Sequence, residues 1–260
     1  MNQAWLQTQY LVKELFGDDL SGKIATVIGS TGTGKSTMAQ QLILYYFTQL
    51  KQQNNLTDKD VAVYITTDRG ILLERTRQIC NAFGWKYTDF SKHFKLEVAK
   101  TLQEQHFIIT SKLSKIIGYN NCRILVVDCM NHLAFEDWKE TTSKTKPDGR
   151  KPDGRMEAFK IYKKLDKQMT TLLHLARDNN VFVFLTVFPK KNYSHTIPDD
   201  WVRGFFGSEK IPHLSDYVFW VIQNVSSGVI RCTVLKHRTK PTPFNVSFKI
   251  QDHGYTLYKD

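Results

Sequence analysis

The sequence of 260 residues has few cysteines and no long apolar run. Its four cysteines form no Cys-x-x-Cys pair and have no histidine at ligand spacing, so we expect reduced thiols, with neither a disulfide framework nor a zinc site. A transmembrane helix needs roughly 18 consecutive apolar residues, and no stretch comes close. The start of the chain lacks the basic and apolar regions of a secretory signal. A cytosolic or nuclear protein is therefore expected. The cysteines are Cys80, Cys122, Cys129 and Cys232.

What the sequence does have is an ordinary globular composition with a strong excess of positive charge. Hydrophobic residues make up 41% and charged residues 23%, which suffices for one sizeable core. The 36 Lys and Arg residues outnumber the 25 Asp and Glu residues, giving a formal net charge of +11. This excess favours a polyanionic partner, either nucleic acid or an anionic membrane surface. The alternative is a soluble protein that is basic without such a partner.

Apolar strands alternate with amphipathic helices through most of the chain. This alternation predicts an α/β fold with a mainly parallel central sheet and helices on both of its faces. The last strands are joined by short turns, which predicts an antiparallel C-terminal extension. A tandem KPDGR repeat over 146–155 predicts an exposed loop within 139–155. We expect strands at 23–28, 61–65, 123–128, 181–187, 217–223, 229–235, 244–250 and 255–258, and helices at 1–20, 38–50, 73–83, 97–117 and 160–177.

A glycine-rich segment between the first strand and the next helix fits the phosphate-binding motif GxxxxGK[ST] at every fixed position. Glycines allow the backbone N–H groups to turn toward a phosphate, and the helix N-terminus adds partial positive charge. Lys35 is expected to reach the β- and γ-phosphates, and the Ser36 hydroxyl to hold Mg²⁺. The candidate nucleotide-binding residues are Gly29, Ser30, Thr31, Gly32, Thr33, Gly34, Lys35, Ser36 and Thr37.

Asp128 is the second candidate for the magnesium site. It ends the apolar strand RILVVD, so its carboxylate should emerge at the carboxyl edge of the sheet beside the glycine-rich loop. An acid at this place holds the magnesium shell in P-loop NTPases. The next residue is Cys129, so a catalytic carboxylate does not follow directly.

With these motifs the sequence resembles the RecA-like ATPase core, particularly the eukaryotic and archaeal strand-exchange recombinases and their paralogues. Four segments in the family's order carry the resemblance. They are LVKELFGDDLSGKIATVIGSTGTGKSTMAQQL, VAVYITTDRGILLERTRQICNAFGW, RILVVDCMNHL and the stretch from residue 160 to VIRCTVLKHRTKP. The resemblance implies a RecA-like P-loop NTPase fold with ATP and Mg²⁺ as cofactors. It places an N-terminal helical lead-in at 1–20 and the ATPase core at 21–260.

The same resemblance implies further site residues. Asp68 matches the family's catalytic glutamate and would act with Lys35, although the aspartate side chain is one methylene shorter than that of glutamate. Lys236 and Arg238 match a Lys-x-Arg pair that reaches nucleotide bound to a neighbouring subunit; a plain exposed strand end is the alternative. Phe188 stands near the place of a glutamine that senses the γ-phosphate. These departures indicate ATP binding with weak hydrolysis.

Two basic segments match the loops that face DNA in the family. Flexible cations in 133–158 and 189–210 would neutralise phosphates without reading sequence, and aromatic residues in the second segment suit base stacking. A solvated charged insertion is the alternative for the first segment, and core packing of Phe205 and Phe206 for the second. The candidate DNA-binding residues are Lys144, Lys146, Arg150, Lys151, Arg155, Lys190, Lys191 and Arg203.

The function expected from these features is that of an ATP-binding recombinase paralogue in homologous-recombination DNA repair. It would bind single-stranded DNA and a related RecA-like subunit, support a recombinase filament, and act as a weak DNA-dependent ATPase. Its expected location is the nucleus, or the cytoplasm in a prokaryote, with no membrane association. Two alternatives remain open: a KaiC-like signalling ATPase or hexameric helicase-type motor, and a non-enzymatic scaffold that nucleotide stabilises.

Overall fold

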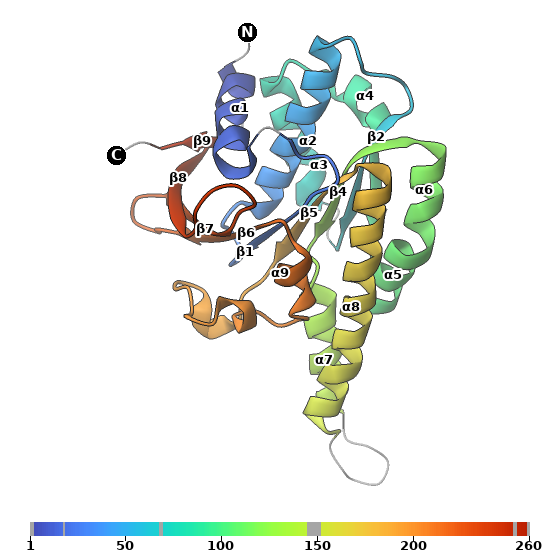
Figure 1. Ribbon diagram of the computed structural model, residues 1–260, viewed down its shortest axis with the longest axis vertical. Helices are drawn as coiled ribbons and strands as arrows, with labels where there is room; N and C mark the ends of the chain where they lie inside the picture. Colours follow the sequence, from blue (N-terminus) through green and yellow to red (C-terminus); the bar gives the residue numbers. More distant parts are fainter. Residues whose placement is uncertain (1–2, 18, 68–69, 145–151, 252–253, 259–260) are drawn as a thin grey trace.

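The computed structural model describes residues 3–17, 19–67, 70–144, 152–251 and 254–258 and shows the expected α/β architecture (Figure 1). The described strands form one sheet of nine, in the order β3-β2-β4-β5-β1-β6-β7-β8-β9. The strands from β3 to β6 run parallel, and those from β6 to β9 run antiparallel. The strands are β1 (Ile24–Gly29), β2 (Asp60–Thr66), β3 (Phe94–Val98), β4 (Asn121–Asp128), β5 (Phe182–Val187), β6 (Tyr217–Gln223), β7 (Val229–Lys236), β8 (Phe244–Gln251) and β9 (Gly254–Leu257).

Helices cover both faces of this sheet (Figure 1). The first three helices pack on one face, and most of the later ones pack on the other. A single π-helical turn, Ile108–Lys112, joins α5 to α6. The helices are α1 (Gln3–Phe16), α2 (Lys35–Gln52), α3 (Gly70–Ala82), α4 (Tyr87–Phe90), α5 (Leu102–Phe107), α6 (Leu113–Tyr119), α7 (His132–Ser143), α8 (Gly154–Asn179) and α9 (Lys210–Leu214).

The central strands are buried on both faces, which explains their continuous apolar sequences. In β1, Ala25 and Val27 join the core under α1 and α2, whereas Ile24 and Ile28 join the core under α8. The same alternation recurs in β2, β4 and β5. Burying an unpaired polar side chain in the middle of these strands would cost free energy of folding. Charged functional side chains are therefore expected at the ends of the strands, along an edge of the sheet.

The strand β3 was not expected from the sequence. Its residues, FKLEV, mix polar and apolar side chains, and each is only half buried because the strand lies at the edge of the sheet. The helix expected over 97–117 is wrong at its start, since residues 97 and 98 belong to β3. The other predicted strands are present within one or two residues of the expected bounds.

Both ends of the segment 139–155, which was predicted to be a loop, belong to helices, and residues 145–151 between them lie outside the described residues. Helix α7 continues to Ser143, and α8 begins at Gly154 because the Asp153 carboxylate accepts a hydrogen bond from the Arg155 N–H at 2.9 Å and so caps the helix. The two helices project from the body as a hairpin (Figure 1). The Trp138 indole of α7 donates to the Gly154 carbonyl at the start of α8, at 3.0 Å, and so joins the two helices. Within the described ranges, no helix has the length and hydropathy needed to cross a membrane.

Candidate nucleotide-binding site

The glycine-rich loop lies at the carboxyl edge of the parallel strands, between β1 and the first turn of α2. Gly32 and Gly34 have φ values of 85° and 77°, a left-handed conformation that favours glycine. A Cβ on Gly34 would also lie 2.7 Å from the Tyr255 hydroxyl oxygen. No side chain caps the N-terminus of α2, which leaves this end of the 18-residue helix available to an anion.

Lys35 is almost fully buried, with 6% of its surface exposed. Its Nζ donates hydrogen bonds to the carbonyls of Gly29 and Ser30, at 2.7 and 2.8 Å. The ammonium group also lies 4.5 Å from the centroid of the Phe188 ring. Burial lowers the pKa of Lys35, although the nearby Asp128 carboxylate opposes this effect. The buried cation thus lies within the loop that would hold an anion.

A short chain of hydrogen bonds joins the two expected magnesium residues. The Tyr64 hydroxyl donates to Asp128 Oδ2 at 2.6 Å and accepts a hydrogen bond from the Ser36 side chain. The Thr186 hydroxyl donates to the other carboxylate oxygen, Oδ1, at 2.5 Å. Burial, followed by the Asp128 charge, raises the pKa of Tyr64 well above its usual value, so the phenol keeps its proton and remains a donor. Asp128 is thereby held in one orientation.

Lys35, Ser36 and Asp128 line one cleft of about 500 Å³, and Phe188 lines it as well. The lining includes seven residues of the glycine-rich loop and α2, together with Asp128 and further side chains from β2, α3, α7 and β8. A hydroxyl and a carboxylate are oxygen ligands of the kind Mg²⁺ prefers. No cluster of three His, Cys, Asp or Glu that could hold another metal occurs among the described residues. The donor set therefore fits a magnesium nucleotide.

Comparison with known proteins identifies the family. A protein-family model described as Rad51 matches residues 7–196, about three quarters of the chain. The chain belongs to the Rad51 family. Its members are recombinase-related proteins of the RecA type, which bind ATP with Mg²⁺ and hydrolyse it in the presence of DNA. No match was found among the curated proteins. The matched residues contain the whole glycine-rich loop, Asp128 and Phe188.

The residues expected to bind nucleotide lie along the loop between β1 and α2. Ser30 donates from its hydroxyl to the Ser194 carbonyl at 3.0 Å, and Thr33 donates to the Ser30 carbonyl at 2.8 Å. Thr31 and Thr37 line the cleft. The expected catalytic Asp68 lies outside the described residues.

The Lys236–Arg238 pair lies away from the cleft of its own chain. Residue 236 pairs with Val218 at the start of β6, whereas the glycine-rich loop follows the far end of the neighbouring β1. Lys236 Nζ donates to the His213 carbonyl at 2.9 Å, and Arg238 lies 3.5 Å from an Asp216 carboxylate oxygen. Any contact with nucleotide would have to be with that of another subunit.

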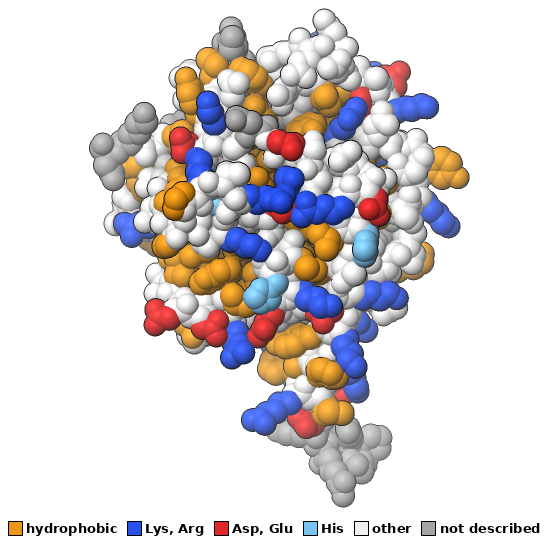
Figure 2. Space-filling view, in the orientation of Figure 1, with side chains coloured by type: hydrophobic (Ala, Val, Ile, Leu, Met, Phe, Trp, Pro, Cys, Tyr) orange, Lys and Arg blue, Asp and Glu red, His pale blue; other side chains and the backbone are white. Residues whose placement is uncertain are grey.

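The expected DNA-binding residues are spread over the projecting hairpin and the segment after β5. Figure 2 shows Lys and Arg side chains along the hairpin, mixed with exposed hydrophobic ones. Lys144, Arg155, Lys190 and Lys191 are exposed, and Lys144 pairs with Glu140 at 2.6 Å. Lys146, Arg150 and Lys151 lie outside the described residues.

Arg203 and the two phenylalanines near it have intramolecular partners. Arg203 forms ion pairs with Asp200 at 3.6 Å and Glu209 at 3.0 Å, which offset its charge. Phe205 is buried in the core. Phe206 packs against Trp138 of α7, with ring centroids 5.5 Å apart. Base stacking by these two rings is therefore not favoured.

Several residues of the site carried no signal in the sequence. Tyr64 and Thr186 lie inside apolar strands and are recognised only when parallel pairing sets them beside Asp128. Tyr255 comes from β9, more than 200 residues after the loop, yet its hydroxyl donates to the Thr33 carbonyl. Asn131 holds the backbone of Phe188 by two hydrogen bonds. Such partners follow from tertiary structure rather than from local patterns.

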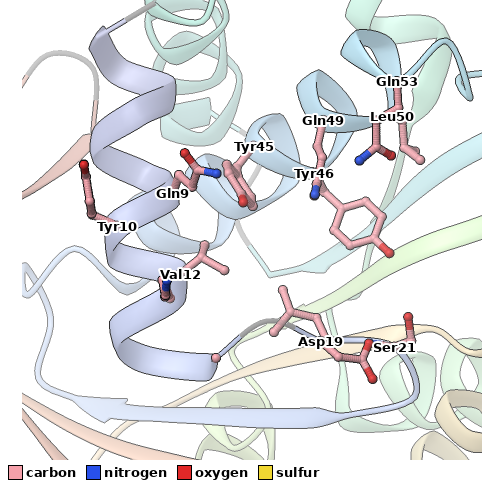
Figure 3. Close-up of a pocket in the computed structure, with 13 residues that line it drawn as sticks. Gln9, Tyr10, Val12, Asp19, Ser21, Tyr45, Tyr46, Gln49, Leu50 and Gln53 are labelled. Carbon is pink, nitrogen blue, oxygen red and sulfur yellow. The ribbon is translucent and has the colours of Figure 1, made fainter.

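A second cleft, of about 510 Å³, lies between α1 and α2 (Figure 3). Its lining includes Gln9 and Tyr10 from α1, and Tyr45, Tyr46 and Gln49 from the C-terminal half of α2. This half of a helix carries the negative end of its dipole, which disfavours phosphate. Of these two clefts, only the first has the glycine-rich loop and the N-terminus of a helix in its lining.

We predict that Tyr64→Phe lowers the free energy of unfolding by about 1–3 kcal/mol, because the half-buried carboxylate of Asp128 loses a donor. Urea denaturation of the two proteins measures the difference. Tyr119→Phe is the matched control, since Tyr119 is 83% exposed. Equal stability of the two variants would contradict the role given to the Tyr64 hydroxyl.

Proposed function

We propose that this chain is an ATP-binding recombinase paralogue that binds single-stranded DNA and a related subunit, and supports recombinase filaments in homologous-recombination DNA repair. The observation that carries the proposal is the assembly of Lys35, Ser36 and Asp128 in one cleft of a Rad51-family chain. Repair and recombination are the processes in which this family acts. The nucleus is the proposed location in a eukaryotic cell.

The nucleotide would lie with its phosphates on the N-terminus of α2. Lys35 and the loop N–H groups would neutralise the phosphates, and Ser36 and Asp128 would hold Mg²⁺, which shields the phosphate charge. In our proposal Lys35 and Asp68 are the catalytic residues. Asp68 stands where the family has a glutamate, and Phe188 provides an aromatic ring near the place of its glutamine. Both differences favour slow ATP hydrolysis and an accessory role in the filament.

A neighbouring subunit of the same fold would use the Lys236–Arg238 end of the sheet. Both side chains lie at the edge opposite the glycine-rich loop, where they could reach the nucleotide of the next subunit in a head-to-tail assembly. Arginine or lysine supplied in trans stabilises phosphate charge in this class of ATPase. Nucleotide at such a junction would strengthen the association of the two subunits.

The proposed function predicts that the chain binds magnesium nucleotide through Lys35. Lys35→Ala removes a charged donor, so the dissociation constant for a fluorescent adenine nucleotide should rise roughly 10- to 100-fold. Lys115→Ala is the control, because this exposed lysine lies on α6, far from the loop in sequence and outside the cleft. Equal affinity of wild type and the Lys35 variant would overturn the nucleotide site.

The proposed function also predicts that single-stranded DNA binds in a salt-dependent, sequence-independent way. The slope of log affinity against log salt should decrease by about 1.4 in the double variant Lys190→Ala/Lys191→Ala, since each phosphate contact on single strands contributes about 0.7. The double variant Lys86→Ala/Lys115→Ala changes the net charge equally and should leave the slope unchanged. A flat salt response in the wild type would contradict DNA binding.

A further inference from the structure

The ammonium group of Lys35 has little capacity left for phosphate. An ammonium has three N–H donors. Two of them are donated to the carbonyls of Gly29 and Ser30, at 2.7 and 2.8 Å. The Phe188 ring lies 4.5 Å from the same nitrogen and covers it on another side. One N–H is left, which serves a single phosphate oxygen rather than oxygens of both the β- and γ-phosphates.

The ring of Phe188 is attached to a fixed backbone. The Asn131 side chain accepts a hydrogen bond from the Phe188 N–H at 2.9 Å and donates to the Phe188 carbonyl at 2.9 Å. The same amide nitrogen donates to the Phe206 carbonyl at 2.8 Å. Asn131 is 2% exposed, so this clamp lies in the interior. The ring also packs edge-to-face against His132, with centroids 5.9 Å apart.

Position 188 therefore presents an apolar wall where the terminal phosphate would lie. A phenyl ring offers no N–H or O–H donor, and bringing a phosphate charge against it removes water without replacing the lost hydrogen bonds. Among the described residues that line the cleft, Arg75 and His132 are the other basic side chains. Arg75 donates to the Gln251 carbonyl at 2.6 Å and to Gln78 at 2.9 Å, which directs its guanidinium toward β8 and its own helix.

We propose that Phe188 determines the nucleotide specificity of this site, and that the site binds a magnesium nucleoside diphosphate at least as tightly as the triphosphate. This inference rests on the proposed nucleotide-binding function and adds to it the class of ligand. The loop N–H groups, the one free N–H of Lys35, Ser36 and Asp128 suffice for the diphosphate and its metal. The γ-phosphate would receive no hydrogen bond from Phe188 and would contact the phenyl ring instead.

Equilibrium binding of magnesium ADP and of a non-hydrolysable magnesium ATP analogue to the full chain tests this proposal. We expect the dissociation constant of the wild type for magnesium ADP to be equal to, or lower than, its dissociation constant for the ATP analogue. Phe188→Gln introduces an N–H donor and removes the ring, so the affinity ratio should shift roughly tenfold toward the triphosphate. Phe188→Leu keeps an apolar wall without a donor, so its ratio should stay within about threefold of the wild type.

The outcomes separate this inference from the function on which it rests. A wild type that binds the triphosphate tenfold or more tightly than the diphosphate overturns the role of Phe188 and leaves the nucleotide site standing. A Phe188→Gln variant that folds normally and keeps the wild-type ratio also overturns it. Absence of binding for both nucleotides, unchanged by Lys35→Ala, overturns the proposed function itself and the inference with it.

Discussion

The hydrogen bonds that join Ser36 through Tyr64 to Asp128 connect three elements that are distant in sequence: the start of α2, the middle of β2 and the end of β4. The Asp128 carboxylate is half buried, so its charge must be satisfied by donors on the neighbouring strands, and Tyr64 and Thr186 provide them. This arrangement is possible because β2, β4 and β5 are parallel and end at the same edge. The geometry of the candidate site thus depends on the pairing of the sheet.

The C-terminal strands contribute to the same site from the other side. Gln41 of α2 exchanges hydrogen bonds with the Tyr255 backbone, donating at 3.0 Å and accepting at 2.7 Å, and also donates to Thr8 of α1 at 2.7 Å. Gly254 has a φ of 114° and leaves room for Gln41, whose Oε1 would lie 2.6 Å from an added Cβ. A buried and fully paired network of this kind fixes the relative positions of its members. The antiparallel extension is therefore part of what holds the glycine-rich loop.

Much of this structure could be predicted from the sequence, for physical reasons that differ between its parts. Strands buried on both faces give continuous apolar runs, and the glycine-rich loop needs glycines at fixed positions, so both leave local signals. The edge strand β3 is half exposed and gives no such signal, and the capping role of Asp153 was hidden within a repeat typical of loops. The partners Tyr64, Asn131 and Tyr255 depend on contacts across 57 or more residues, which no local pattern reports.

The central claim is that phosphates and magnesium are bound where α2 begins and β4 ends. Its most direct test is an experimentally determined structure of the chain with magnesium and an adenine nucleotide. The account predicts phosphate against residues 30–37 and the metal between the Ser36 hydroxyl and the Asp128 carboxylate. Nucleotide bound in the cleft between α1 and α2, or magnesium bound without either of these two side chains, would contradict it.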